Sequence, residues 1–578
     1  MIARLKGSRF SVLFQEFVAQ FFISESVTSD HQLRTAAIGV MAFLVTPGFL
    51  HSMQLSIPFE FFWFRFPELL EPFIRLNATL FITYGIVAMG VIAAFTWDAL
   101  GFDRRDAMVL GPLPVSGAIV ISAKLAALGA LLLSGAAAVN VMTAFPFAMV
   151  ASNHTGAIAA LRHFTGHMIA TMCAATFVFC GLVTIRALVG MIGDRREAIT
   201  SLVQFVLVSA VLCFFVLAPT ALRVTHGRRG AARAYMVQIP AWSPTNWFLG
   251  LYETIRGSSG PELWSSALVA IGVTLGSLTL AILATIAGYR RQLQLALAPS
   301  ASAASQGAAP MRRALARVIV GRDRIARATA DFIIQTFARN RPQQAPVAMN
   351  TAVGLAIVVA GLSRSASDLS ALMRPRTAVL WIPLLLAYWA TIGLRASFFV
   401  PSELPASWTF QSNAPLRSRA YWSAVRASLI AIIVPPAATL ALALGFAVGW
   451  RVAAWHALIV TSVLVLFLEV IALTIDYIPF TRPYPPGHAK LKLLWPLYLF
   501  GMFAVAFWPT RYELRILDDP AALRQMTAWI GVAIAVLEVV GRWRALKWSV
   551  TWDEEVPDGL SSVTVLSIGN PLHNAAGN

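Results

Sequence analysis

The sequence predicts an all-α integral membrane protein that crosses the bilayer many times. Hydrophobic residues make up 58% of the 578-residue chain and charged residues only 12%, whereas soluble domains carry about 25% charged residues. Apolar runs of about 20 residues, the length that spans a bilayer as a helix, recur along the whole chain. Together these observations exclude a soluble multidomain enzyme and a disordered chain.

Twelve apolar segments are predicted to span the membrane. Trp and Tyr cluster near several segment ends, as they do where transmembrane helices meet the lipid headgroups. Prolines inside some segments should kink the helices, which helix bundles tolerate. The twelve segments are 35–52, 78–97, 118–146, 165–188, 199–219, 263–288, 347–363, 378–398, 424–448, 455–477, 493–508 and 525–541.

The positions of Lys and Arg predict the orientation. A net charge of +18 would suggest nucleic acid in a soluble protein, but in a membrane protein basic residues gather in cytoplasmic loops. With the N-terminus inside, about two thirds of the 45 Lys and Arg residues fall on the cytoplasmic side. We therefore expect cytoplasmic N and C termini and no nucleic-acid partner. Residues 220–262, on the outer side, carry five arginines that this scheme does not explain.

An internal repeat divides the chain into two halves. Residues 16–22 match 331–337, with Gln20 aligned to Gln335, and the polar match outside the spans argues against chance similarity between apolar segments. The prediction is two parallel six-span halves, with a basic connector between them and a polar cytoplasmic tail. The boundaries are 1–290 for the first half, 291–345 for the connector, 346–545 for the second half and 546–578 for the tail.

Each half opens with an amphipathic segment. Residues 10–22 place several Phe side chains on one helical face, and residues 311–340 combine arginines with Leu, Val and Ile. Such helices lie in the membrane interface. The ten arginines between residues 289 and 346 should also attract anionic lipids to the connector.

The loop after the second span, residues 98–116, has the most informative polar pattern. Asp103, Arg104, Arg105 and Asp106 alternate in sign before an apolar patch and a Gly111–Pro112 break. This pattern predicts a short helix that ends at the break and lies along the inner face of the membrane. The helix would offer charged and apolar contacts to a cytoplasmic partner.

This loop resembles the segment after the second span of ABC-2-type export permeases, and in particular of the long bacterial ABC exporter permeases. The matching residues are Asp106, Leu110, Leu113, Pro114, Val115, Ser116 and Lys124. The resemblance implies six spans per unit, an amphipathic helix before the first, and a bacterial inner-membrane location. It also implies that the loop forms a coupling helix that docks on a separate ATP-binding subunit. In the second half, residues 413–419 lack the Leu-Pro-Val-Ser order, so a second coupling site is not expected there.

No nucleotide site is predicted on this chain. None of its five lysines follows a Gly, so no Walker A loop is present. We therefore expect a permease without enzymatic activity or a cofactor of its own, which exports an unidentified substrate using ATP and Mg bound by the partner subunit.

Two other classes of function stay open. A twelve-span ion-coupled transporter is the first alternative, because Asp103–Arg104 falls where major facilitator transporters carry Asp-Arg. However, Ala99 and Asp106 stand where that motif needs glycines. A membrane-embedded lipid or glycan enzyme is less favoured, because no convincing cluster of acids or histidines is found.

Ionisable residues inside the membrane are costly and often functional. The candidates are Arg186, Glu469, Asp476 and Glu538, with Asp476 expected on the same helical face as Glu469 and a possible ion pair between Glu469 and Arg186. His163 and His167 have the one-turn spacing of metal ligands, but no acid or Cys completes a set. We expect these histidines at the membrane interface and no metal site.

Overall fold

The structure is a computed structural model. It describes residues 8–21, 45–102, 104–110, 112–192, 196–221, 223–226, 235–238, 241–258, 260–297, 309–363, 375, 377–402, 410, 418–481 and 495–547.

Within these ranges, nine helices are long and apolar enough to cross a membrane, and each overlaps one predicted span. This confirms a helical protein of the polytopic membrane class. The nine are α5 (Leu70–Phe95), α7 (Gly117–Ala151), α8 (Ala157–Val189), α11 (Pro261–Leu297), α14 (Arg341–Ser363), α16 (Thr377–Ser397), α18 (Ser418–Ala443), α20 (Trp450–Leu473) and α23 (Pro520–Lys547).

The remaining three predicted spans stay predictions. Residues 45–54 are mostly helical, but 22–44 lie outside the described residues. The 199–219 span falls in α9 (Arg196–Ala221). Within the described residues, the apolar stretch of α9 is shorter than the length needed to cross a membrane. The 493–508 span is not one regular helix, because α21 (Trp495–Met502) and α22 (Trp508–Ile516) are joined by a π-helical turn, Phe503–Phe507. That turn lies just before Pro509, which has no amide hydrogen to continue a regular helix.

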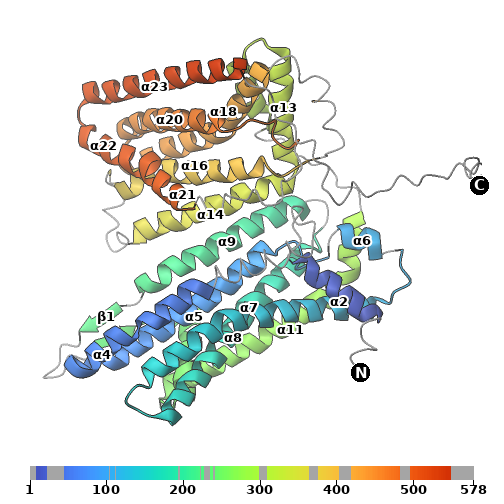
Figure 1. The fold of residues 1–578 in the computed structure, drawn as a ribbon, viewed down its shortest axis with the longest axis vertical. Helices are drawn as coiled ribbons and strands as arrows, with labels where there is room; N and C mark the ends of the chain where they lie inside the picture. Colours follow the sequence, from blue (N-terminus) through green and yellow to red (C-terminus); the bar gives the residue numbers. More distant parts are fainter. Residues whose placement is uncertain are drawn as a thin grey trace, which may run out of the picture.

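The helices form two bundles that lie side by side (Figure 1). One contains the elements up to α11 and the other those from α14 onward. The two bundles meet where α9 packs against α14, around the buried side chains of Ala94, Val208 and Ala352. Among the described residues, the first half has two apolar cores, the second half has one large and one small core, and a further small core lies at the contact between the halves.

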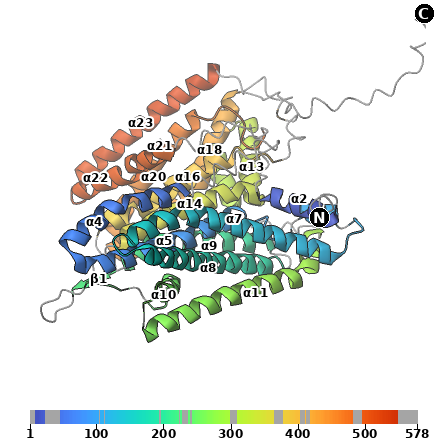
Figure 2. The same cartoon turned by 60° about the horizontal axis from the view of Figure 1, so that its bottom comes forward.

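The two ends of the first bundle carry different elements (Figures 1 and 2). One end carries α2 (Arg9–Gln20) and α6 (Arg104–Leu110), and we call it the α6 end. The opposite end carries α4 (Ser56–Arg65) and α10 (Pro244–Arg256), and we call it the α10 end. The short 3-10 helix η1 (Pro67–Leu69) leads into α5 there.

A small hairpin departs from the all-α prediction. Strands β1 (Arg223–His226) and β2 (Tyr235–Gln238) pair antiparallel, with Arg223 opposite Gln238. The hairpin belongs to the arginine-bearing segment 220–262. A strand of four residues is too short to show a periodic pattern, so neither strand could be predicted from the sequence.

The amphipathic connector forms two helices, although one continuous segment was expected. α12 (Ala309–Val320) and α13 (Arg324–Arg339) are separated at Gly321, whose φ of 77° is left-handed and suits glycine. The Asp323 carboxylate then caps α13 by accepting from the Ile325 and Ala326 amides at 3.0 and 3.2 Å. The short α19 (Gly445–Val448) follows α18 in the second bundle.

Candidate functional site

Three polar side chains join α2, α6 and α7 at the α6 end. The Gln20 amide donates from Nε2 to Asp106 Oδ1 at 2.8 Å, and Lys124 Nζ donates to Gln20 Oε1 at 3.4 Å. Asp106 is 4% exposed and Lys124 is fully buried. Because buried charged groups need polar partners, Gln20 is placed to satisfy one acid and one base on two different elements. We call these three residues the Gln20 bridge.

Two aromatic rings complete the surroundings of Lys124. Its Nζ lies 4.5 Å from the ring centroid of Phe17 and 5.6 Å from that of Phe102. Such cation–π contacts stabilise an ammonium that has lost water. The Phe102 amide in turn donates to Gln292 Oε1 at 3.2 Å. The bridge is therefore tied to α2, α7 and α11 as well as to α6.

α6 and the turn that follows it expose apolar side chains on the surface of the protein. Met108, Val109 and Leu113 are 53%, 55% and 46% exposed. Leu110 and Val115 instead pack against the core of the first bundle, and the Pro114 carbonyl accepts from Arg9 Nη1 at 3.0 Å. A firmly held segment with exposed apolar side chains has the character of a docking surface. We call residues 104–116 the α6 segment.

The structure brings together much of the predicted coupling loop. α6 is the short helix expected before the Gly111–Pro112 break. Asp106 and Lys124 meet through Gln20, and Ser116 immediately precedes α7. Arg104 and Arg105 begin α6, while Asp103 lies outside the described residues. Gln20 was not among the predicted site residues, although its alignment with Gln335 in the repeat was a signal for it.

Arg186 is buried near the same end, in α8. Its Nε donates to the Trp97 carbonyl at 3.1 Å. A Cβ on Gly101 would lie 3.1 Å from the guanidinium carbon of Arg186, so a side chain there would press on it. Arg186 thus holds the chain between α5 and α6 against α8.

The predicted ion pair between Glu469 and Arg186 is wrong. Glu469, fully buried in α20, forms its ion pair with Arg426 of α18. Arg426 also lies 3.6 Å from Glu538 of α23, which pairs with Arg542 one turn away. Glu469 and Arg426 both belong to the second bundle, whereas Arg186 belongs to the first. Glu538 is therefore a member of this cluster.

Asp476 does not share a helical face with Glu469. α20 ends at Leu473, and Asp476 lies in the irregular segment that follows. The same helix carries another buried group, which sequence reasoning missed. His456 Nδ1 lies 3.0 and 2.9 Å from the two carboxylate oxygens of Glu513 in α22, and both residues are fully buried. Their separation of 57 positions left no local pattern to predict the pair.

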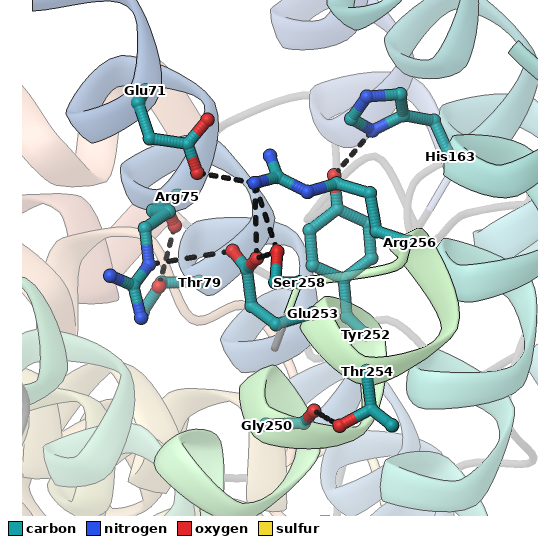
Figure 3. Close-up of polar contacts among 10 residues, drawn as sticks. All are labelled: Glu71, Arg75, Thr79, His163, Gly250, Tyr252, Glu253, Thr254, Arg256 and Ser258. Carbon is teal, nitrogen blue, oxygen red and sulfur yellow. Dashed lines mark hydrogen bonds and ion pairs between the residues drawn. The ribbon is translucent and has the colours of Figure 1, made fainter. Parts of the chain in front are cut away.

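A second polar cluster lies at the α10 end (Figure 3). The buried Glu253 carboxylate lies 3.4 Å from Arg75 Nε and 3.2 Å from Arg256 Nη2, and it accepts from Ser258 Oγ at 2.7 Å. Arg256 also pairs with Glu71. These contacts fasten α10 to the start of α5. They also account for Arg256, one of the five arginines in 220–262.

The electrostatics of this cluster follow from its burial. Burial opposes the charge on Arg256, but the hydrogen bond to Glu71 and the charges of Glu253 and Glu71 outweigh it and raise its pKa. Burial raises the pKa of the Tyr252 phenol. Arg256 therefore stays charged and Tyr252 stays neutral at ordinary pH. The Tyr252 hydroxyl lies 2.7 Å from His163 Nδ1.

The two histidines that were expected at the membrane interface are buried within the protein. His163 and His167 are 6% and 1% exposed. His163 contacts Tyr252, and His167 Nε2 lies 3.2 Å from Thr143 Oγ1. Their side chains pack among aromatic rings between α7, α8 and α10. Among the described residues, no group of three His, Cys, Asp or Glu side chains could hold a metal ion.

No protein-family model matches the chain, and no curated protein or solved structure is significantly similar to it.

Proposed function

We propose that this chain is the membrane-spanning permease subunit of an ATP-driven export system of the ABC-2 type. The observation that carries the proposal is the α6 segment, where Met108 and Val109 of α6 and Leu113 of the following turn are exposed, while buried polar contacts anchor the helix. An exposed apolar patch is typical of an interaction surface. The partner is a separate ATPase that binds ATP and Mg, so this chain is not itself an enzyme.

The same proposal assigns twelve spans, a bacterial inner-membrane location and a cytoplasmic α6 end with both termini inside. Two packing relations support the duplication behind this arrangement. α2 packs against α7 in the first half, and α13 packs against α18 in the second. These are the amphipathic openers of the two predicted repeats, each placed against the third predicted span of its own half.

The Gln20 bridge suggests how a movement of α6 would reach the membrane helices. A partner that pushes the α6 segment acts on Asp106, and Gln20 links that residue to α2 and to Lys124 of α7. Coupled elements of this kind transmit a change only if they are held together. In this proposal the bundles rock against each other at the α9–α14 contact, and the substrate passes between the two halves.

Affinity purification of the full-length chain from native membranes tests the proposal. The unsubstituted protein should retain an ATPase with Walker motifs, and Leu113→Asp together with Val109→Asp should lose it. Ile158→Asp serves as the matched control, because Ile158 is 74% exposed but lies in the first turn of α8, at the α10 end. Recovery of the chain without any ATPase from membranes that still transport would overturn the proposal.

An ion-coupled transporter is the second candidate, and the cluster of Glu469, Arg426 and Glu538 favours it. Carboxylates buried within membrane helices often mark ion or proton pathways. This candidate predicts transport that depends on an ion gradient and is lost in Glu469→Gln. The permease proposal instead predicts transport that stops when ATP is depleted while the ion gradient is maintained.

A further inference from the structure

An open apolar groove of about 710 Å³ lies in the second bundle. Its walls are residues 463–470 of α20, residues 504–512 around the π-helical turn and α22, and residues 522–530 of α23. The volume falls in the range of ligand pockets, about 300–1,000 Å³. Trp508 and Trp529 line it and are 64% and 67% exposed, so the groove opens on the surface that meets lipid.

The groove has a polar end and an apolar end. Apart from the two tryptophans, the lining side chains that can form hydrogen bonds are Tyr512 and Gln525. Both lie toward the end of the groove where α22 leads into α23. The opposite end is lined by aliphatic and small side chains such as Val470, Ala504 and Ile530. This division suits an amphiphile whose head lies near α22 and whose tail lies along α20.

Positive charge gathers at the polar end. Arg511 and Arg515 lie one turn apart on α22, Arg524 lies in the second turn of α23, and all three are exposed. Two exposed acids, Asp518 and Asp519, lie between them, but Asp519 accepts from the Ala521 and Ala522 amides at 2.9 and 3.2 Å and so caps α23. Glu513 faces away into its pair with His456. The three arginines outnumber the two aspartates, so the net charge at this end is positive and favours an anionic headgroup.

We propose that this groove holds one acyl chain of an anionic membrane phospholipid, with its phosphate at Arg511 and Arg515. The site is separate from the α6 segment and does not depend on an ATPase partner. α23 packs against α20, and it is also held at its start after α22 and near Glu538, where Arg426 of α18 reaches it. Between those points only a small part of its surface is covered by protein.

Photo-crosslinking tests the site in the full-length protein. The chain is placed in phosphatidylcholine nanodiscs that contain a small fraction of a probe lipid with a diazirine in its acyl chain. The probe is phosphatidylglycerol in one sample and phosphatidylcholine in the other. Phosphatidylglycerol should label residues 463–470 and 522–530 in preference to the exposed face of α11. Arg511→Gln and Arg515→Gln should each lower the preference for phosphatidylglycerol by about fivefold, the equivalent of about 1 kcal/mol per arginine.

Two controls separate a specific site from general lipid contact. Ala522→Trp fills the groove and should abolish labelling there with either lipid, whereas Val536→Trp, on an exposed position of α23 outside the groove, should not. Arg451→Gln removes an exposed arginine in the first turn of α20 and should leave the headgroup preference unchanged. Equal labelling of the groove and of α11 with both lipids would overturn the proposal and indicate surrounding lipid only.

Discussion

At the scale of single residues, two buried carboxylates of this protein have ion-pair partners that lie far away in the sequence. Glu253 of α10 meets Arg75 of the membrane helix α5, and Glu469 meets Arg426 from the neighbouring helix of its own bundle. An unpaired buried charge costs several kcal/mol. Each of these pairs therefore fixes the position of one element against another, as Glu253 does for α10.

Replacing Glu253 by Gln should destabilise the protein by about 3 kcal/mol. Removal of one partner from a buried pair costs about 3–5 kcal/mol, and the lower end applies because Arg75 is 36% exposed. Unfolding by SDS titration measures this change. Glu262→Gln, at an exposed position in the first turn of α11, should unfold like the unsubstituted protein. Equal stability of both variants would show that the cluster does not hold α10.

At the scale of elements, α6 depends on α2 for its position. α6 has only seven residues, and isolated helices of that length are not stable in water. Its stability must come from tertiary contacts, namely the Gln20 bridge and the packing of Leu110 in the core. The hydrogen bond from Gln20 to the Asp106 carboxylate is a charge-assisted part of that anchor.

Substituting Gln20 by Leu should loosen α6 without unfolding the bundle. A hydrogen bond to a charged group contributes about 1.5–3 kcal/mol, so amide hydrogens of α6 should exchange about tenfold faster or more. Hydrogen exchange with mass spectrometry measures this directly. Gln15→Leu changes an exposed residue on the same helix and should leave α6 exchange unaltered. Unchanged hydrogen exchange in Gln20→Leu would show that the Gln20 bridge does not anchor α6.

Local patterns predicted the elements, whereas their partners required the three-dimensional structure. Apolar runs of the right length correctly predicted nine long apolar helices, because a helix in lipid satisfies its own backbone hydrogen bonds. The break at Gly321 and the π-helical turn before Pro509 depend on single residues within otherwise continuous patterns. The wrong partner for Glu469 has another cause, since an ion pair depends on which helices are adjacent, and periodicity carries no such information.

At the scale of the whole molecule, the two bundles share a small contact. Ala352, Ala94 and Val208 are buried where α14 meets α5 and α9, with Met349, Phe205 and Leu212 packed around them. Small residues at such a contact let helix backbones approach closely, and van der Waals packing drives helix association within lipid. The packing of α9 against α14 therefore holds the two halves together.

Ala352→Leu should weaken the association of the two halves by about tenfold. Extra methylene groups in a packed core cost about 1–3 kcal/mol, and Ala352 is fully buried. A protease site placed between residues 300 and 306 allows the halves to be separated after purification in detergent. Retention of the first half by a tagged second half then reports the contact. The control is Ala314→Leu, at an exposed position of α12. A tagged second half with this substitution should retain the first half as the unsubstituted protein does.

The orientation of the molecule decides whether the α6 segment can meet a cytoplasmic ATPase. Thr155 lies in the exposed turn between α7 and α8, and Arg322 lies in the exposed turn between α12 and α13. The positive-inside distribution predicts that Thr155→Cys reacts with a membrane-impermeant maleimide in intact cells, whereas Arg322→Cys reacts only after permeabilisation. The unsubstituted chain is the control, because Cys173, Cys180 and Cys213 lie within α8 and α9. The reverse labelling would place α6 outside, where no ATP is available, and would exclude the permease proposal while leaving the lipid groove intact.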